Sequence, residues 1–121
     1  MATIQQVAEA FSAHRFAETY PFLHPQVRWT LVGAARLEGR EQVVQACEAA
    51  LDQLSKSTQQ VLRFKTVVGP DSVAVDAITR YVDKKWMTTI VSSCDVFEFA
   101  QGHLTAITSY TVEIPAGDLH R

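Results

Sequence analysis

The 121-residue chain has few cysteines, no excess of positive charge and no long apolar run, and each absence excludes a class of protein. Cys47 and Cys94 lie in separate elements without a Cys-x-x-Cys spacing, which favours buried free thiols over a disulfide or a redox pair. The eleven Lys and Arg residues are spread along the chain and balanced by thirteen Asp and Glu residues, so we expect no nucleic-acid partner. No stretch approaches the roughly 20 apolar residues of a membrane span, and no secretion signal opens the chain. We therefore expect a cytoplasmic protein with no membrane partner.

What remains is the composition of an ordinary globular protein. Hydrophobic residues make up 47% of the chain and charged residues 20%, with a net charge of -2. A chain of this length can bury roughly two-thirds of the surface that it exposes when unfolded, so it needs no disulfide or metal for stability. We expect a single domain over residues 1–121.

The first third of the chain has helical patterns. Ile4, Val7 and Phe11 recur at helical spacing, and Thr3 with Gln6 forms a capping box, which predicts a helix that begins near Thr3. A second, short helical segment follows around residues 16–20. A third helix is predicted over residues 43–54, where apolar residues again recur every third or fourth position.

The rest of the chain has the alternating pattern of strands. A short strand is expected over residues 27–32, then a loop over residues 33–39 before the third helix. After that helix come a strand ending near residue 68 and three longer strands over residues 73–83, 86–99 and 103–114. The short connections between these strands predict an antiparallel meander.

Both faces of the longer strands carry apolar residues, so the sheet needs a cover on each side. The helices can cover one face. We expect a second copy of the chain to cover the outer face, giving a homodimer to which Tyr110 contributes.

Asp95 is the most informative single residue, because it interrupts the apolar run of residues 90–99 in the middle of a predicted strand. A buried carboxylate is costly unless it is paired, protonated or hydrogen-bonded. If the next hairpin turns at about residues 84 and 85, Arg80 lies opposite residue 89. Strand alternation puts Asp76 and Arg80 on one face of their strand and Asp95 on one face of the next. If both are the concave face, the three residues share a pocket, and a contact between Arg80 and Asp95 would need a diagonal reach or a neighbouring strand.

Two interpretations of this group remain open. An excess carboxylate in an apolar pocket would raise the pKa of Asp76 or Asp95 and make a general acid or base. Alternatively, Asp95 accepts hydrogen bonds from its neighbours while Asp76 and Arg80 form a structural ion pair.

Two local sequences resemble a known superfamily. The segment Leu23-His24-Pro25-Gln26-Val27-Arg28-Trp29, followed by Leu37-Glu38-Gly39-Arg40-Glu41, is similar to the SnoaL-like branch of the nuclear transport factor 2-like superfamily, and so is the segment 95–104. The resemblance covers essentially the whole chain. It implies an α+β fold shaped like a cone, in which N-terminal helices pack on a curved antiparallel β-sheet and enclose an apolar pocket.

The resemblance also implies which positions to compare with enzymes of that superfamily. Ketosteroid isomerases place a phenol, a protonated carboxyl and a carboxylate base at the positions of Phe11, Asp95 and Thr30, so here Asp95 alone matches. Limonene epoxide hydrolases have an arginine and an aspartate two residues apart on one strand and a second aspartate on the last strand. The matching positions here are Arg80, Val82 and Ser109, so only the arginine matches. Neither mechanism transfers whole.

We expect a pocket protein for a small hydrophobic molecule that works without a cofactor. One hypothesis is an isomerase, cyclase or epoxide hydrolase with Asp95 as acid or base, Arg80 as electrostatic stabiliser and Asp76 beside them. The other is a non-catalytic module that binds a ligand or a protein. The residues expected to line the pocket are Phe16, Tyr20, Trp29, Thr30, Phe64, Ile78, Val82, Phe97 and Ser109, although core packing is the alternative for the aromatic residues.

The four histidines, His14, His24, His103 and His120, lack the spacing of metal ligands. We expect no metal site and surface positions for these residues, with His14 at the mouth of the pocket. Motifs of nucleophilic, metal-dependent or nucleotide-binding enzymes are also missing from the sequence.

Overall fold

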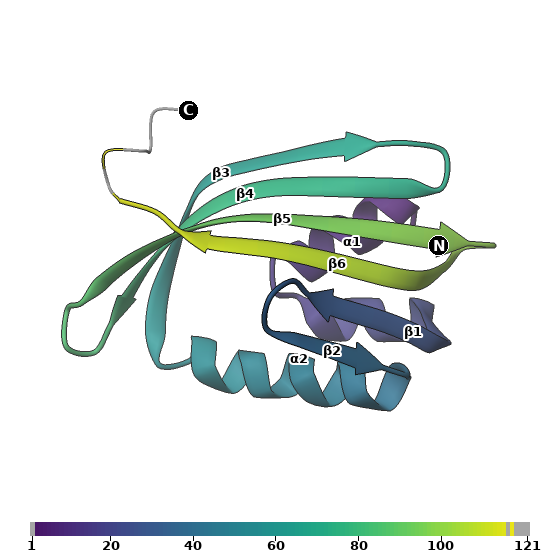
Figure 1. The fold of residues 1–121 in the computed structure, drawn as a ribbon, viewed down its shortest axis with the longest axis horizontal. Helices are drawn as coiled ribbons and strands as arrows, with labels where there is room; N and C mark the ends of the chain where they lie inside the picture. Colours follow the sequence, from purple (N-terminus) through teal and green to yellow (C-terminus); the bar gives the residue numbers. More distant parts are fainter. Residues whose placement is uncertain (1, 116, 118–121) are drawn as a thin grey trace.

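The computed structural model describes residues 2–115 and residue 117, and it has two α-helices, one 3₁₀ helix and six strands. Figure 1 shows these elements arranged as a long, twisted sheet with helices on one side. In chain order they are α1 (Ile4–Ser12), η1 (Phe16–Phe22), β1 (Leu23–Leu31), β2 (Ala35–Glu38), α2 (Arg40–Leu54), β3 (Ser57–Val68), β4 (Ser72–Asp83), β5 (Thr88–Ala100) and β6 (His103–Glu113).

The six strands form one sheet in the order β2-β1-β6-β5-β4-β3. Strands β3 to β6 are the predicted antiparallel meander. Strand β1 joins this meander parallel to β6, and the short β2 pairs antiparallel with β1 at the edge. The sheet is therefore mixed, and the crossover from β2 to β3 through α2 lets that helix cover its concave face.

The start of α1 follows from its sequence. The backbone N–H of Gln6 donates to Thr3 Oγ1 over 3.1 Å, and the backbone N–H of Thr3 donates to Gln6 Oε1 over 2.9 Å. The predicted capping box is confirmed, and it satisfies donors that the first helical turn leaves unpaired.

The predicted loop over residues 33–39 is wrong in its middle, because Ala35–Glu38 forms β2. A short edge strand with mostly exposed residues has no alternating apolar pattern to reveal it. Gly33, with φ of 82°, makes the tight turn into β2, and Gly39, with φ of 90°, leads out of it into α2.

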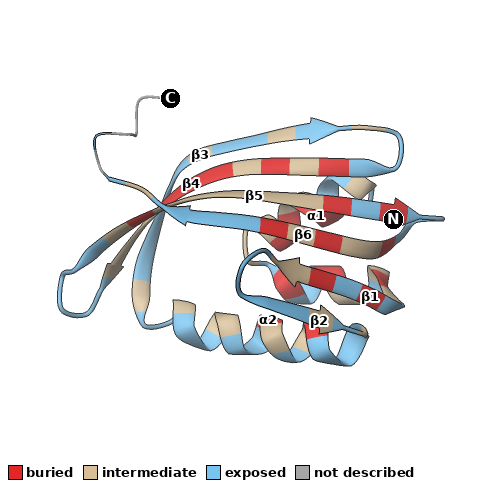
Figure 2. Cartoon of the chain, viewed as in Figure 1, coloured by how far each residue is buried: buried red, intermediate tan, exposed pale blue. Residues whose placement is uncertain are grey.

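The core lies between the concave face of the sheet and the helices. Figure 2 shows buried residues along β1, β4, β5 and β6 and on α1. Helix α1 packs against β3, β4 and β5, whereas α2 packs against β1, β2 and β3. The fully buried side chains include Val27, Val43, Phe97, Leu104 and Ile107.

Neither of the two cysteines, both of which lie among the described residues, forms a disulfide. Cys47 is buried in α2, where burial raises the pKa of its thiol to about 12, and Cys94 is half-buried on β5. Among the helices of the described residues, none combines the length and the apolar character that a membrane crossing requires.

Candidate functional site

A cavity of about 300 Å³ opens between the concave face of the sheet and the ends of the helices. Its volume is at the lower end of the roughly 300–1,000 Å³ that is typical of small-molecule sites. Seventeen residues line it: Phe11, Ser12, His14, Phe16, Trp29, Leu31, Ala50, Gln53, Leu54, Ala77, Thr79, Tyr81, Val91, Ser93, Asp95, Ser109 and Thr111. No lysine or arginine is among these lining residues, and Asp95 is the one acidic side chain among them.

Asp95 is held at the cavity wall by two serines. Ser12 Oγ, from the last residue of α1, donates to Asp95 Oδ2 over 2.8 Å, and Ser109 Oγ on β6 donates to Asp95 Oδ1 over 2.6 Å. The indole Nε1–H of Trp29 donates to Ser109 Oγ over 2.9 Å. Hydrogen bonds from hydroxyl donors stabilise a carboxylate, and this chain of donors fixes its orientation.

The end of α1 places His14 beside this carboxylate. The backbone N–H of Arg15 donates to the Ala10 carbonyl and that of His14 to the Phe11 carbonyl, which is a Schellman motif. In this motif the residue after the cap adopts a left-handed conformation, and His14 has φ of 65°. Glycine is usual at that position, and a histidine there places an imidazole at the cavity wall.

Burial at the cavity shifts the pKa values of His14 and Tyr81. Burial lowers the pKa of His14 from its ordinary value of 6.5, and the nearby Asp95 carboxylate opposes this shift without cancelling it. Burial raises the pKa of Tyr81 above its ordinary value of 10.0, and the charge of Asp95 adds to this effect while Thr79 opposes it. At neutral pH the site therefore contains a neutral imidazole and a neutral phenol.

The inner wall of the cavity is aromatic. The ring of Phe11 contacts the rings of Phe16, Trp29 and Phe97 edge-to-face, at centroid distances of 4.9, 5.0 and 5.7 Å. Such pairs have fixed relative orientations, so this wall keeps its shape.

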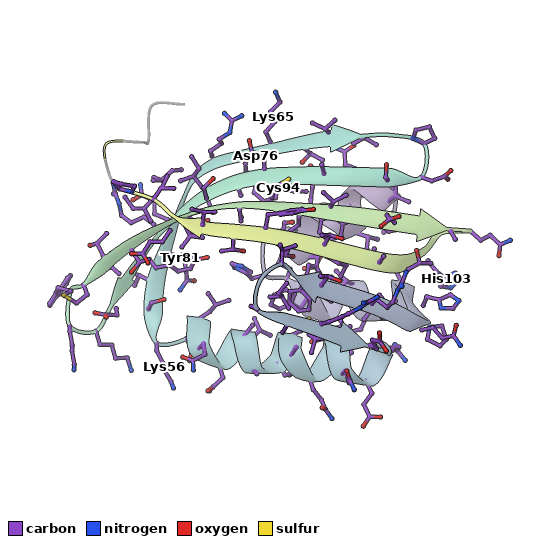
Figure 3. The ribbon with its side chains drawn as sticks, viewed as in Figure 1. Lys56, Lys65, Asp76, Tyr81, Cys94 and His103 are labelled. Carbon is purple, nitrogen blue, oxygen red and sulfur yellow. The ribbon has the colours of Figure 1, made fainter. Side chains whose placement is uncertain are left out.

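The structure corrects the expected placement of Asp76 and Arg80. Arg80 pairs with Ile90 rather than with residue 89, so the even-numbered residues of β4 point away from the cavity. The Asp76 carboxylate forms an ion pair of 3.0 Å with Arg63, and Arg80 donates to Gln60 Oε1 over 3.1 Å. Figure 3 shows Asp76 beside Lys65 and apart from Tyr81, which lines the cavity. Neither Asp76 nor Arg80 shares a pocket with Asp95.

Four of the nine expected lining residues border the cavity or the hollow next to it. Phe16, Trp29 and Ser109 line the cavity. Phe64 lines an adjoining hollow of about 390 Å³ that shares Ser12 and His14 with the cavity and continues it outwards between α2 and β3.

The remaining expected residues lie outside the cavity for different reasons. Thr30, Ile78 and Val82 are on the strand face opposite to the lining residues. Phe97 is on the correct face but has no exposed surface and belongs to the core. Tyr20 is turned towards α2, where its hydroxyl donates to Glu48 over 2.6 Å.

Sequence reasoning missed Ser12 and Tyr81 and treated His14 only as a residue of the cavity mouth. Ser12 and His14 could have been predicted from their position, because they lie at the end of α1, which borders the cavity. Of the other histidines, His24 and His103 lie next to each other, with 6.5 Å between their ring centroids, and His120 lies outside the described residues. Among the residues that are described, no three His, Cys, Asp or Glu side chains are grouped so that they could hold a metal ion.

Comparison with protein families gives a match over most of the chain. The model of the family described as "SnoaL-like domain" matches residues 4–107. No curated protein gives a significant match.

Solved structures show the same fold at low sequence identity. An NTF2-like protein of unknown function from Cytophaga hutchinsonii superposes with a TM-score of 0.78 at 22% identity, over 88% of this chain and 93% of that one. A Xanthomonas campestris protein described as a candidate polyketide cyclase gives 0.70 at 19% identity, over 88% and 85%. An epoxide hydrolase from M. tuberculosis, described as LEH-like, gives 0.65 at 16% identity, over 89% and 81%.

Proposed function

Because the chain belongs to the SnoaL-like domain family, we propose that its cavity binds a small, neutral, apolar molecule and that Asp95 moves a proton on it. The observation that supports this proposal is the hydrogen-bonded carboxylate of Asp95 in a cavity with no lysine or arginine among its lining residues. An anionic ligand would be repelled by that carboxylate and would find no cation in the wall. The expected ligand is therefore uncharged.

A proton transfer next to a carbonyl group fits these side chains. Asp95 accepts a proton from the carbon beside the carbonyl, and the electron pair of that C–H bond moves towards the carbonyl oxygen. The neutral Tyr81 phenol and the neutral His14 imidazole are candidate donors to the oxygen as its negative charge develops. If the substrate has a C=C bond next to that carbon, the anion is a dienolate, and return of the proton from Asp95 to its far carbon completes an isomerisation. In a cyclisation the enolate carbon attacks a second carbonyl, and the alkoxide that forms takes the proton back from Asp95.

Epoxide hydrolysis fits less well. The Arg80 side chain, which the resemblance placed in that mechanism, lies on the opposite face of the sheet and donates to Gln60. Isomerase or cyclase chemistry needs only the groups that line this cavity.

A non-catalytic binding module is the second candidate. Both oxygens of Asp95 already accept a hydrogen bond, and these bonds connect α1 to β6 through one carboxylate. A group with this role stabilises the position of α1 without any chemistry.

Ligand binding is testable by thermal unfolding. We expect a neutral cyclic ketone or lactone that fits the cavity to raise the free energy of unfolding by about 2.7 kcal/mol at 100 times its Kd. For a domain of this size that corresponds to a rise in Tm of roughly 10 °C. Carboxylic acids of the same skeleton should give a much smaller rise.

A matched pair of variants identifies the cavity as the binding site. Val91→Phe fills the cavity from its wall and should remove the ligand-induced shift. Val67→Phe places the same ring on an exposed position of β3 and should leave the shift unchanged. If neutral ligands stabilise both variants equally, the cavity is not their site.

We also propose that the outer face of the sheet forms a homodimer interface. Tyr110, Val112 and Val67 lie on the face away from the cavity and are 50%, 60% and 57% exposed. A stable interface requires roughly 800 Å² from each partner, and this extended face offers apolar side chains on β3 and β6. Light scattering should give a dimer mass that Tyr110→Asp reduces to that of a monomer, whereas Val32→Asp, at an exposed turn, should leave it unchanged. A monomer mass for the unmodified protein would contradict this proposal.

A further inference from the structure

The tip of the β4–β5 hairpin carries a tryptophan in an unfavourable position. Trp86 is 84% exposed and Met87 is 65% exposed, so neither side chain contributes much to the core. Trp86 also has φ of 65°, the left-handed conformation that suits glycine and is strained for a bulky side chain. Folding alone would favour a glycine at this position, for both reasons.

The backbone of the tip is well defined. The Asp83 carboxylate accepts hydrogen bonds from the backbone N–H groups of Lys85 and Met87, over 2.8 and 3.0 Å. Two further backbone bonds, from Trp86 to the Asp83 carbonyl and from Asp83 to the Met87 carbonyl, close the turn. The indole is thus presented to solvent by an ordered turn.

Three lysines surround the indole. Lys84 and Lys85 precede it in the turn, and Lys56, at the junction of α2 and β3, lines a groove of about 250 Å³ together with Lys84 and Trp86. Within the described part of the chain, none of the three ammonium groups has an ion-pair partner. Asp83, the acid of the turn, accepts both backbone hydrogen bonds at Oδ1 and sets one negative charge against the three lysines. The tip is locally positive on a protein whose net charge is -2.

We propose that this tip binds the surface of an anionic lipid bilayer, with Trp86 and Met87 in the interface and the three lysines against the headgroups. Figure 1 shows the β4–β5 hairpin projecting beyond the body of the molecule, near the start of β3. Tryptophan prefers the boundary between water and lipid, and lysines near an anionic surface each strengthen binding. The contact is peripheral and requires no helix that spans the bilayer, and it revises our expectation of no membrane partner.

The shape of the tip favours a bilayer over a folded protein as partner. A stable protein interface buries on the order of 1,000 Å² or more and uses a broad surface from each side. A projecting turn of four residues offers only a small part of that area. A fluid bilayer can close around a narrow tip. Its surface offers many equivalent binding positions, so weak binding at each is sufficient to hold the protein at the membrane. This inference does not depend on what the cavity binds.

Co-sedimentation with lipid vesicles tests the proposal. With vesicles of 70% phosphatidylcholine and 30% phosphatidylserine, we expect binding about tenfold or more stronger than with pure phosphatidylcholine, and weaker binding as salt is added. Vesicles should also shift the Trp86 emission to the blue, since Trp29 is buried and does not change its surroundings.

Two variants separate the indole from the lysines. Trp86→Gly should abolish both sedimentation and the emission shift, yet leave the unfolding midpoint unchanged or higher, because glycine adopts this φ without strain. Lys84→Gln should weaken binding about fivefold, which is the effect of one lysine at an anionic surface. The matched control is Lys65→Gln, an exposed lysine on β3 that Figure 3 shows far from Lys56, and it should bind like the unmodified protein.

Three results would overturn the proposal. They are no sedimentation of the unmodified protein at millimolar lipid and low salt, equal binding by Trp86→Gly, and equal binding to charged and neutral vesicles. In the first case a protein partner becomes the better explanation for the exposed indole.

Discussion

We expect Asp95→Asn to lower the rate of proton exchange on a bound ketone by a factor of about 10²–10⁴, the usual contribution of a general base. The amide of asparagine has no basic oxygen at neutral pH but nearly the same shape as the carboxylate. Its oxygen can still accept from Ser12 or Ser109, so the free energy of unfolding should change by no more than about 1 kcal/mol. The measurement is deuterium incorporation beside the carbonyl group, followed by NMR in D₂O.

Asp76→Asn is the matched control. It makes the same change on the neighbouring strand, but the Asp76 carboxylate faces away from the cavity and pairs with Arg63, at a side-chain exposure of 33%. We expect an unchanged exchange rate and a loss of stability below about 1 kcal/mol. If Asp95→Asn unfolds the protein while no exchange is detectable in the unmodified chain, Asp95 is a structural link between α1 and β6 and the enzyme proposal is wrong.

The fold was predictable because several local signals agree. The α+β cone, the capping box at Thr3 and the meander of long strands were all predicted, and the structure and its neighbours confirm them. The resemblance to the SnoaL-like branch is confirmed by the family match over residues 4–107. Helix starts and short turns are encoded by a few adjacent residues, so a single sequence reveals them.

The site was less predictable, because it depends on a strand register that one turn decides. We expected the hairpin to turn at about residues 84 and 85, which would place Arg80 opposite residue 89. The observed turn is longer, and Arg80 pairs with Ile90. A difference of one residue in register moves every side chain of a strand to the other face. In the structure, Asp76 and Arg80 therefore lie on the face away from the cavity, and Tyr81 lies on the face that lines it.

The longer turn between β4 and β5 could not be predicted from the sequence. Such a turn needs a residue with positive φ, which glycine or asparagine normally supplies, whereas Trp86 supplies it here. The hydrophobic pattern could not correct the register, because both faces of β4 carry apolar residues, with Val75 on one and Ile78 on the other. The place of His14 in the cavity wall was hard to predict for a similar reason. Like Trp86, His14 has the left-handed backbone conformation at a position where glycine is usual.

Phe97→Ala should produce the largest loss of stability among single substitutions at the residues expected to bind ligand. Phe97 has no exposed surface and its ring contacts Phe11 beneath the cavity wall. Truncation of a buried phenylalanine to alanine costs about 3–5 kcal/mol, because it loses apolar contacts and leaves a void. That loss is a large part of the 5–15 kcal/mol typical of a domain. Urea denaturation followed by circular dichroism measures it.

Phe64→Ala is the matched control, because the same side chain on β3 is 39% exposed and borders only the outer hollow. We expect a loss of about 1 kcal/mol or less there, since less apolar surface returns to water. A similar small loss at Phe97 would mean that the region beneath the aromatic wall is loosely packed, and the cavity would then extend deeper than its lining residues indicate. A large loss at Phe97 alone would establish that the aromatic core beneath the cavity wall is tightly packed, and a pocket needs such packing to hold Asp95 and a ligand in a fixed relation.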